Sequence, residues 1–576
     1  MAAADALRPP RGAVPDVAAR GGAQLRVAGG VGVGPGREEA LDRLAQGVDV
    51  LVVGGGITGA GVALDAASRG YRVGLVERAD YASGTSSRST RLVHGGIRYL
   101  PQGHLGLVRE ALRERRLLLR LAPHLVRPLG FVVPLYRGLK APLGVRLPAV
   151  ARPFAGWGVR FGLWLYDAFS RDPALRHRPL PLREVARLAP GLRTEGLRKA
   201  FLYFDAKTDD VRLTHAVLAT ARALGAVTVN YAEVAGLLHS RGRVAGAGVV
   251  DRLTGRSLEV PARAVVNATG AWAERVAALA GAPPFRLQHS KGVHLVLRPG
   301  VVRASCAVVV PETDDGRLAF LVPWGDRFGL GTTDEPYAGD LEWPAPSEAE
   351  VRYLLDHASR YLDRPLRWED VTAAYAGVRP LVARAEGSTA SLSRDHLVVV
   401  SGGGLVTVTG GKLTTYRSMA ADAVDEVVRR DGSRVGSRTH RIRLAGADGL
   451  EEAAAALADL EPDQREHLLS TYGSLAAEVV ALARAEPELC GRLVEGFPHL
   501  KAEVAYACRH EQLVSLVDCL YLRTRLAVTD VEAADRAAGE VARLMARELG
   551  WGEGEVARQV DRYRATRERF LEPKLT

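Results

Sequence analysis

A single stretch near the N-terminus, residues 48–77, constrains the fold of this chain more than any other. It begins with an apolar run, Val48 to Val53, whose length and branching are typical of a buried parallel strand. Three glycines follow at GxGxxG spacing, and apolar residues then recur at helical spacing as far as Gly70. A second apolar run ends at the acidic residue Glu77. This order of strand, glycine turn, helix, strand and acid predicts a Rossmann-like unit that binds a dinucleotide.

Each glycine of the turn has a physical role in that prediction. Gly54 permits the tight turn, and Gly56 lets the backbone approach a pyrophosphate. Gly59 allows the helix to pack closely on the strand, and the N-terminus of that helix faces the phosphate charge. Glu77 follows Gly59 by 18 residues, where a carboxylate can accept hydrogen bonds from an adenosine ribose. A glycine-rich turn alone is also a common structural feature, so the prediction depends on the complete register.

Length and composition indicate a globular protein with several domains. At 576 residues the chain is too long for one ordinary core, and we expect two or three domains. No apolar run approaches the roughly 18 residues of a transmembrane helix. The four cysteines form no CxxC pair, so we expect reduced thiols in a cytoplasmic protein and no metal site. Residues 1–36 lack the apolar segment of a secretory signal, and we expect this extension to be disordered.

The net charge of +11 is concentrated in one part of the chain. Residues 88–187 contain 19 Lys and Arg against 5 Asp and Glu. Within them, residues 131–169 interleave Phe, Trp and Tyr with Arg and Lys, a combination that suits a membrane interface. We therefore expect peripheral contact with an anionic membrane surface; a solvated basic face is the alternative. Nucleic acid is not expected as a partner, because no nucleic-acid motif accompanies the charge.

Hydrophobic patterning predicts segments that alternate between two domains, followed by a helical end. Residues 285–335 alternate strands and turns, which favours an antiparallel sheet, and residues 264–270 read as a buried strand that enters a glycine turn. The expected helices include 37–46, 107–121, 205–225 and 347–361. We expect a cofactor domain formed by 37–105, 200–283 and 392–432, a substrate domain formed by 106–199 and 284–391, and a helical cap formed by 440–576.

Two motifs carry a resemblance to a known family. Residues 54–70 (GGGITGAGVALDAASRG) and 410–420 (GGKLTTYRSMA) resemble the two signatures of FAD-dependent, quinone-linked glycerol-3-phosphate dehydrogenases. Between them GTSSRSTRLVHGGIRYL, SKGVHLVL, GTTDEPY and GVRPL follow in the order of the family, and the helical end contains HLKAEVAYACRHE, LRTRL and MARELGW. The resemblance runs from about residue 38 to residue 570, and the first 36 residues have no counterpart.

The resemblance implies a fold and a reaction. The fold would be an α/β FAD-binding domain of the glutathione-reductase and D-amino-acid-oxidase type, a substrate domain with an antiparallel sheet, and an all-helical C-terminal cap. The reaction would be oxidation of sn-glycerol 3-phosphate at C2 to dihydroxyacetone phosphate, by hydride transfer to FAD. Electrons would pass to a membrane quinone, and the enzyme would attach peripherally to the inner face of the cell membrane. A homodimer is compatible with these expectations.

Such a reaction needs cations that bind a phosphate dianion. Arg98, Arg379 and Lys412 are the expected ligands, because each lies in a matched motif beside glycines. Arginine grips phosphate in a fork, and lysine adds a point charge. Any one of these side chains could equally be an ordinary surface or ion-pair cation.

A second requirement is a group that accepts the proton of the C2 hydroxyl. His94 is the preferred candidate, since a neutral imidazole has a suitable pKa. His289, beside the SKG motif, is a competing candidate, and His94 could instead only pack near the flavin. Tyr99 and either Thr332 or Thr333 are expected to position the substrate.

The remaining site residues are expected to hold FAD. They are Gly54, Gly56, Thr58, Gly59 and Glu77 in the dinucleotide unit; Ser83, Gly84, Thr85, Ser86 and Ser87 along the pyrophosphate and flavin; Val234 at the adenine; Ala268, Thr269 and Gly270 at the pyrophosphate; and Leu413 and Thr414 over the isoalloxazine. Without the resemblance, the Ser/Thr loop could equally be a cluster of turns and helix caps.

Three alternative functions remain open at this point. A glycerol-3-phosphate oxidase would return the electrons to O2 and produce H2O2, although the basic aromatic segment favours a membrane quinone. A flavin-binding scaffold without catalysis would have lost the phosphate cations, which are present here. An amino-acid oxidase of the same fold would need a single carboxylate clamp, whereas this chain offers several cations.

Overall fold

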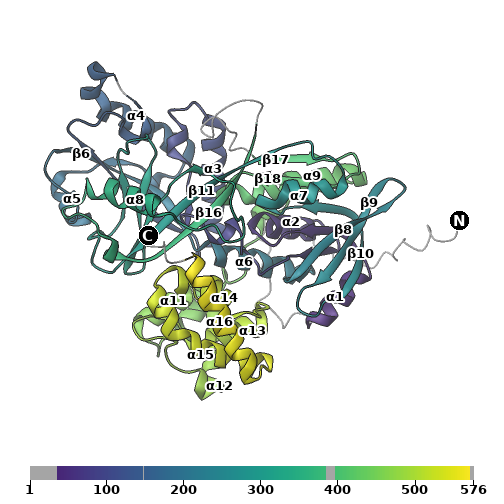
Figure 1. The fold of residues 1–576 in the computed structure, drawn as a ribbon. Coiled ribbons are helices and arrows are strands. Elements are labelled where there is room, and N and C mark those ends of the chain that lie inside the picture. Colours follow the sequence, from purple (N-terminus) through teal and green to yellow (C-terminus); the bar gives the residue numbers. More distant parts are fainter. Residues whose placement is uncertain (1–35, 147, 384–395, 571–576) are drawn as a thin grey trace.

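The computed structural model describes residues 36–146, 148–383 and 396–570. These residues form two sheets with their helices and a separate group of helices at the C-terminal end (Figure 1). The predicted N-terminal extension, apart from Gly36, lies outside the described residues. No helix in the described ranges combines the length and the hydropathy that crossing a bilayer requires.

The first sheet contains the predicted dinucleotide unit. Its strands are β1 (Val48–Val53), β2 (Val73–Val76), β7 (Val227–Val229), β8 (Ala232–Ser240), β9 (Arg243–Asp251), β10 (Ser257–Asn267), β17 (His396–Val400) and β18 (Val406–Gly410). They run in the order β17-β18-β10-β1-β2-β7, with β9 on β10 and β8 on β9. The strands from β18 to β7 are parallel, as the apolar, β-branched run of β1 predicts.

Helices cover both faces of this sheet, because alternate residues of β1 point to opposite sides. Val50 and Val52 share a core with α2 (Ile57–Ser68), α6 (Asp210–Ala223) and α9 (Tyr416–Asp431). Leu51 and Val53 pack on the other side with α1 (Arg37–Ala45) and α7 (Ala273–Ala277).

The second sheet is almost entirely antiparallel, as expected. Its strands are β3 (Leu92–Val93), β4 (Arg127–Tyr136), β5 (Arg178–Pro179), β6 (Leu197–Lys207), β11 (Leu287–Leu297), β12 (Ala307–Val310), β13 (Ala319–Trp324), β14 (Arg327–Gly331), β15 (Glu335–Pro336) and β16 (Val371–Val382). The order is β15-β11-β14-β13-β12-β4-β6-β3, with β16 on β11 and β5 on β6, and only β12 and β4 run parallel. The helices of this domain are α3 (Leu105–Leu121), α4 (Ala155–Ser170), α5 (Leu182–Leu188) and α8 (Glu348–Ser359).

One expected helix begins later than the sequence predicts. Asp205 to Lys207 extend β6 along β4, although we expected them in a helix from 205 to 225. The helix α6 starts at Asp210, where the Asp209 side chain accepts a hydrogen bond from the Arg212 amide and caps it. Pairing with β4 therefore overrides local helix preference, and β6 carries the substrate sheet past the predicted domain boundary at residue 200.

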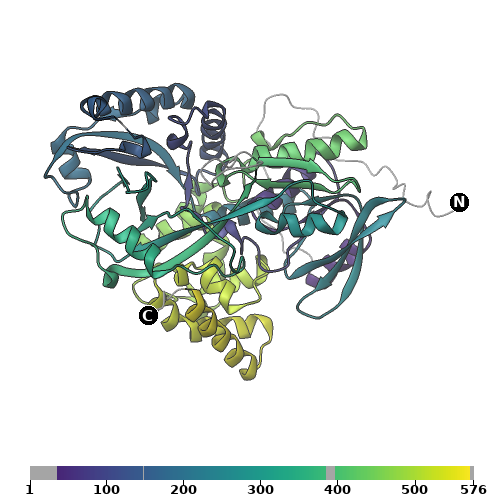
Figure 2. The same cartoon turned by 45° about the horizontal axis from the view of Figure 1, so that its top comes forward.

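The C-terminal residues form a helical cap with its own core. Its helices are α10 (Leu450–Ala456), α11 (Pro462–Tyr472), α12 (Ala476–Ala485), α13 (Lys501–His510), α14 (Leu516–Asp518), α15 (Val531–Leu549) and α16 (Glu553–Phe570). Buried ion pairs join the cap to the first domain: Arg523 to Asp80 at 2.7 Å and Glu511 to Arg212 at 2.6 Å. In both views the cap lies on the side of the molecule opposite α4 (Figures 1 and 2).

Candidate active site

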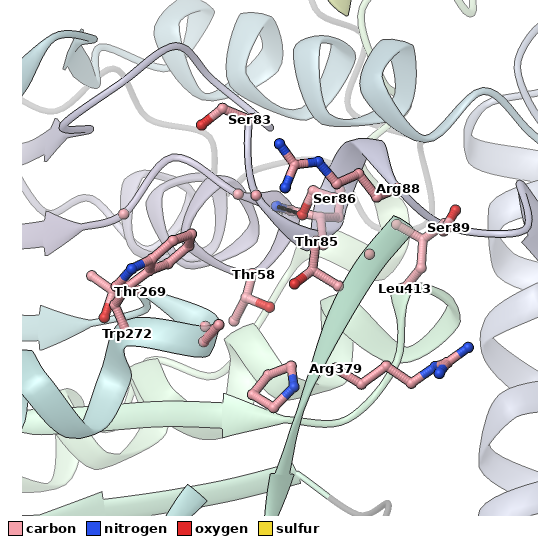
Figure 3. Close-up of a pocket in the computed structure, with 18 of the residues that line it drawn as sticks. Thr58, Ser83, Thr85, Ser86, Arg88, Ser89, Thr269, Trp272, Arg379 and Leu413 are labelled. Carbon is pink, nitrogen blue, oxygen red and sulfur yellow. Dashed lines mark hydrogen bonds between the residues drawn. The ribbon is translucent and has the colours of Figure 1, made fainter. Parts of the chain in front are cut away.

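A single large cavity of about 980 Å³ lies between the two sheets and reaches the cap. All the predicted site residues line it except Gly59 and Ser87. Figure 3 shows Arg379 at one end of the cavity and Trp272 and Thr269 at the other, with Thr58 and Thr85 between them. We call these the substrate end and the cofactor end. No group of three His, Cys, Asp or Glu side chains in the described ranges is arranged to hold a metal ion.

The cofactor end is built largely from backbone that only glycine permits. Gly54 has a φ of +109°, and a Cβ there would lie 2.7 Å from the carbonyl oxygen of Ala268. A Cβ on Gly56 would lie 3.1 Å from the hydroxyl of Ser86, which accepts a hydrogen bond from the Ile57 amide. The glycine turn and the Ser/Thr loop therefore meet at the N-terminus of α2, where a pyrophosphate would be bound.

The two predicted residues outside the cavity lining support this turn. A Cβ on Gly59 would lie only 1.8 Å from the carbonyl oxygen of Gly54, so glycine is required for the close packing of α2 on β1. The hydroxyl of Ser87 is buried and donates to the Gly84 carbonyl at 3.2 Å. Gly59 has the predicted packing role, whereas Ser87 stabilises the loop from behind.

Glu77 is held rigidly at the end of β2. One carboxylate oxygen accepts the Gly55 amide at 2.7 Å, and the other accepts the Ala79 amide at 2.9 Å. Burial raises the pKa of Glu77, and these two amides oppose that effect. The position suits a ribose, as the sequence predicts.

The residues of the cavity fit FAD along its whole length. The volume of the cavity lies at the upper end of the range found for ligand pockets. Val234 and Trp272 line the cofactor end, and Trp272 stacks under the Arg78 guanidinium at 4.7 Å. The Thr85 hydroxyl donates to the Val378 carbonyl at 2.6 Å, which ties the Ser/Thr loop to β16 of the substrate sheet. The predicted flavin position thus lies where the two domains meet.

Three predicted cations gather at the substrate end. The Lys412 ammonium lies 4.0 Å from the centre of the Tyr99 ring, and the Arg98 guanidinium lies 5.0 Å from it and donates to the Tyr99 hydroxyl at 3.0 Å. Arg379 donates to the Thr332 hydroxyl at 3.1 Å. Burial lowers the pKa of Arg379, and Arg98 lowers it further against the opposing effect of Asp334. The cations are therefore close enough to repel one another, an arrangement that an anion would stabilise.

His94 faces the cavity beside these cations. Its backbone amide donates to the Thr414 hydroxyl at 3.1 Å, which links the two family motifs. Burial, followed by the charges of Lys412 and Arg98, lowers the pKa of His94 to about 3. The imidazole is consequently neutral near pH 7, the state that a proton acceptor requires.

A second histidine of the site, His294, was missed by sequence reasoning. It lies in the centre of β11, lines the cavity and shares a hydrogen bond with the Thr90 hydroxyl at 2.9 Å. Its ring stacks on Tyr375 at 5.0 Å, and burial, together with Arg379 and Arg91, lowers its pKa to about 3. The competing candidate His289 is not part of the described lining, and its Nε2 is 2.9 Å from the carbonyl oxygen of Ala271.

A buried polar group beneath His94 was also missed. The Asp205 carboxylate lies at the end of β6 and pairs with Arg115 at 2.7 Å. It accepts the Tyr166 hydroxyl at 2.6 Å and the Gly95 amide at 3.1 Å. This group fixes the glycine turn between His94 and Arg98. The family motif VHGGIRY contains the turn, but its supports come from α3, α4 and β6.

Comparison with known proteins gives matches over nearly the whole chain. A family described as FAD dependent oxidoreductase matches residues 49–417, and one described as C-terminal domain of alpha-glycerophosphate oxidase matches residues 437–556. Glycerol-3-phosphate dehydrogenase 2 of Mycobacterium tuberculosis (strain ATCC 25618 / H37Rv) is 41% identical over 529 residues, which cover 90% of this chain and 87% of that protein. The mitochondrial glycerol-3-phosphate dehydrogenase of Homo sapiens is 38% identical over 542 residues, with 89% and 72% covered.

Two solved structures are similar in fold. The glycerol-3-phosphate dehydrogenase from Bacillus halodurans complexed with FAD has a TM-score of 0.76 and 30% identity, and the match covers 94% of this chain and 98% of that chain. L-alpha-glycerophosphate oxidase from Mycoplasma pneumoniae with FAD bound has a TM-score of 0.52 and 17% identity, with 68% and 96% covered. The second likeness concerns the fold alone.

Proposed function

The chain belongs to the family of FAD-dependent glycerol-3-phosphate dehydrogenases, and we propose that it oxidises sn-glycerol 3-phosphate at C2 to dihydroxyacetone phosphate. The observation that carries this proposal is the cluster of Arg98, Arg379 and Lys412 at the substrate end of the cavity. A phosphate dianion would relieve the repulsion among the three charges. A substrate with a single carboxylate would satisfy them less well, which disfavours the amino-acid oxidase alternative.

The two arginines and the lysine would have different tasks. Arg379 is held by the Thr332 hydroxyl, by the Thr333 carbonyl and by Asp334, so its guanidinium is fixed before substrate binds. Lys412, which follows β18 of the first sheet, contacts the same tyrosine ring as Arg98, which follows β3 of the second sheet. Anchoring the phosphate between the two domains would orient C2 toward the flavin, which is the main contribution of positioning to a hydride transfer.

The chain's own residues would also move the proton. Bound FAD supplies the acceptor for the hydride that leaves C2. His94 would take the C2 hydroxyl proton, because its neutral ring faces the cavity and a bound dianion would raise its depressed pKa. His294 is less suited, since Thr90 occupies its Nε2 and its ring is packed on Tyr375.

We further propose that the electrons leave to a quinone at an anionic membrane on the cytoplasmic side. Four large side chains lie along one face of α4 and the turn before it, and all are more than half exposed: Phe154 65%, Trp157 64%, Phe161 64% and Trp164 58%. Their spacing of three and four residues makes a continuous apolar stripe. Lys140, Arg146 and Arg160 lie near it in the sequence. An apolar stripe flanked by cations is the pattern of a helix that rests in the membrane interface.

An anaerobic experiment tests the reaction and its acceptor. The holoenzyme would be mixed with sn-glycerol 3-phosphate without oxygen while the visible absorbance of the flavin is followed. Bleaching is expected, with rapid recovery when a soluble quinone is added and slow recovery in air. Rapid recovery in air with H2O2 would identify an oxidase. Absence of bleaching would show that the substrate assignment is wrong.

Vesicle flotation tests the membrane assignment. The protein should float with vesicles of anionic lipid at low salt and less with neutral lipid. High salt should release it, because the cations contribute through screened attraction; retention at high salt would mean that apolar insertion dominates. The Trp157→Ser and Phe161→Ser variants should weaken flotation, whereas the Leu182→Ser variant, which also removes an exposed apolar side chain, should not. Equal flotation of all variants would remove the stripe from the proposal.

A further inference from the structure

A second and much smaller cavity, of about 40 Å³, lies where the cofactor domain meets the cap. It shares no described lining residue with the large cavity. Helix α6 contributes Arg212, His215 and Arg222, the segment after α3 contributes His124, and α13 contributes His510. The cavity is thus lined by five nitrogen-rich side chains from three separate parts of the chain.

Several of these nitrogens are buried without a hydrogen-bond partner. Both ring nitrogens of His215 are in this state, and only 4% of that residue is exposed. The Nδ1 atoms of His124 and His510 and the Nη1 atom of Arg222 are also buried without a partner among the described residues. A buried donor without a partner destabilises the folded state, so a group of them at one cavity indicates an occupant.

The charge around the cavity is positive. Arg212 pairs with Glu511 at 2.6 Å, and Glu511 also lies 3.0 Å from Arg523, which pairs with Asp80 as well, so the only carboxylate among the described lining residues is already engaged by arginine. Arg222 has no acidic partner among the described residues. Burial lowers the pKa of His215, and Arg523, Arg212 and Arg222 lower it further. The electrostatic field at this point therefore favours a negative charge.

Size limits what can occupy the cavity. A water needs about 10–15 Å³ on this measure, so the space holds about three waters or one small ion. Glycerol 3-phosphate is too large, which separates this cavity from the substrate site. Water would satisfy the nitrogens but would leave the excess of positive charge uncompensated.

We propose that this cavity binds a small inorganic anion, such as phosphate or a halide, that links α6 to the cap. The anion accepts hydrogen bonds from Arg222 and from one ring N–H each of His215, His124 and His510. Because both domains contribute ligands, the anion stabilises their contact. Ligands that bind only the folded state raise the unfolding temperature with their concentration, so the anion stabilises the holoenzyme in proportion to occupancy.

Thermal unfolding of the FAD holoenzyme at constant ionic strength tests this proposal in solution. Phosphate should raise the Tm in an Arg379→Ala background, in which the substrate site is weakened. Arg222→Gln or His215→Gln should raise the phosphate concentration at half-maximal shift at least about tenfold, whereas the exposed Arg198→Gln should leave it unchanged. An equal response of all variants would overturn the proposal.

Crystals of the holoenzyme with bromide provide a test that does not depend on how the variants fold. An anomalous peak within hydrogen-bond distance of His215 and Arg222, together with the Tm response, supports the anion. A cavity that holds only water, or a bromide peak without any effect of anions on Tm (an adventitious ion only), overturns it.

Discussion

The cofactor end and the substrate end of the large cavity are built in different ways. At the cofactor end, one contiguous turn from Gly54 to Gly59 brings the backbone close to the cavity, and a Cβ at Gly54 or Gly59 would clash with neighbouring backbone. At the substrate end, side chains from segments far apart in the sequence converge, among them Arg98, Arg379 and Lys412. The glycine turn of the cofactor end is a local sequence motif and can be recognised from the sequence. The arrangement of side chains at the substrate end depends on how the sheets are assembled. The difference also predicts which substitutions destroy binding of the cofactor and which affect only the substrate.

The largest effect is expected at the cofactor end. In a Gly59→Ala variant the new methyl group would lie 1.8 Å from the Gly54 carbonyl oxygen, a backbone atom that cannot move away as a flexible side chain could. We expect a loss of at least about 3 kcal/mol in the free energy of unfolding and purification without FAD. The flavin-to-protein ratio of the purified variant measures its FAD content, and thermal unfolding measures its stability.

Gly158→Ala is the matched control for that variant. It places the same methyl group on a helix, α4, where nothing lies within 4 Å, so it should keep the cofactor and full stability. If Gly59→Ala retained FAD at the wild-type ratio, close packing of α2 on β1 would not be required for binding.

The next largest effect is expected at the substrate end. Arg379→Ala removes a fixed guanidinium that makes charged hydrogen bonds worth about 1.5–3 kcal/mol each, so KM for glycerol 3-phosphate should rise about 100-fold or more. The FAD content should not change. Steady-state kinetics with glycerol 3-phosphate and with glycerol measure the effect, which should be confined to the phosphorylated substrate. Arg198→Ala, on the exposed side of β6, is the control. An equal loss with both substrates would contradict the phosphate assignment.

The two ends also differ in their response to pH, because histidines line only the substrate end of the described cavity. His94 and His294 have pKa values of about 3 in the folded protein, against about 6.5 in the unfolded chain. The unfolded state therefore binds more protons between these values, and stability present above pH 6.5 is lost as pH falls toward 3. Each histidine contributes up to about 1.4 kcal/mol per pH unit.

Urea unfolding at pH 5, 6 and 7 measures that slope. His94→Asn and His294→Asn should each reduce it, while His239→Asn, an exposed position on β8, should not. Unchanged slopes in the first two variants would show that these histidines are already protonated in the folded state.

Much of the architecture could be predicted because its signals are local. The turn at residues 54–59 and the run of apolar residues in β1 specify a parallel strand and a phosphate-binding helix without reference to the rest of the chain. The antiparallel second sheet and the helical cap also follow from periodicity and from the family motifs. The residues expected at the cofactor end accordingly line the cavity, except Ser87, which lies behind its loop, and Gly59, which packs α2 on β1; their contact with FAD stays a prediction.

The substrate end was less predictable because its geometry comes from strand pairing. His294 lies in an apolar alternation where a histidine most often only packs. The register of β11 places it opposite Tyr375 and Gly331, in the lining of the cavity that Arg379 also lines. Asp205 was expected at the start of a helix, although it lies in strand β6 and supports the turn after His94. Neither position carries a local signal of its role.

The smallest effect is expected from the hydroxyl that supports this turn. Tyr166→Phe removes a group that donates to Asp205 at 2.6 Å and accepts the Gly95 amide at 2.9 Å, but Arg115 continues to neutralise the carboxylate. Loss of one buried hydrogen bond should cost about 1–3 kcal/mol in the free energy of unfolding and should lower kcat modestly with FAD content unchanged. Tyr136→Phe removes a partly buried hydroxyl outside the cavity lining, which donates to the Arg193 carbonyl at 2.8 Å, and should leave kcat unchanged. Loss of FAD from the Tyr166→Phe variant would mean that the two ends of the cavity are coupled through this turn. They would then differ in how they are built but would not bind their ligands independently.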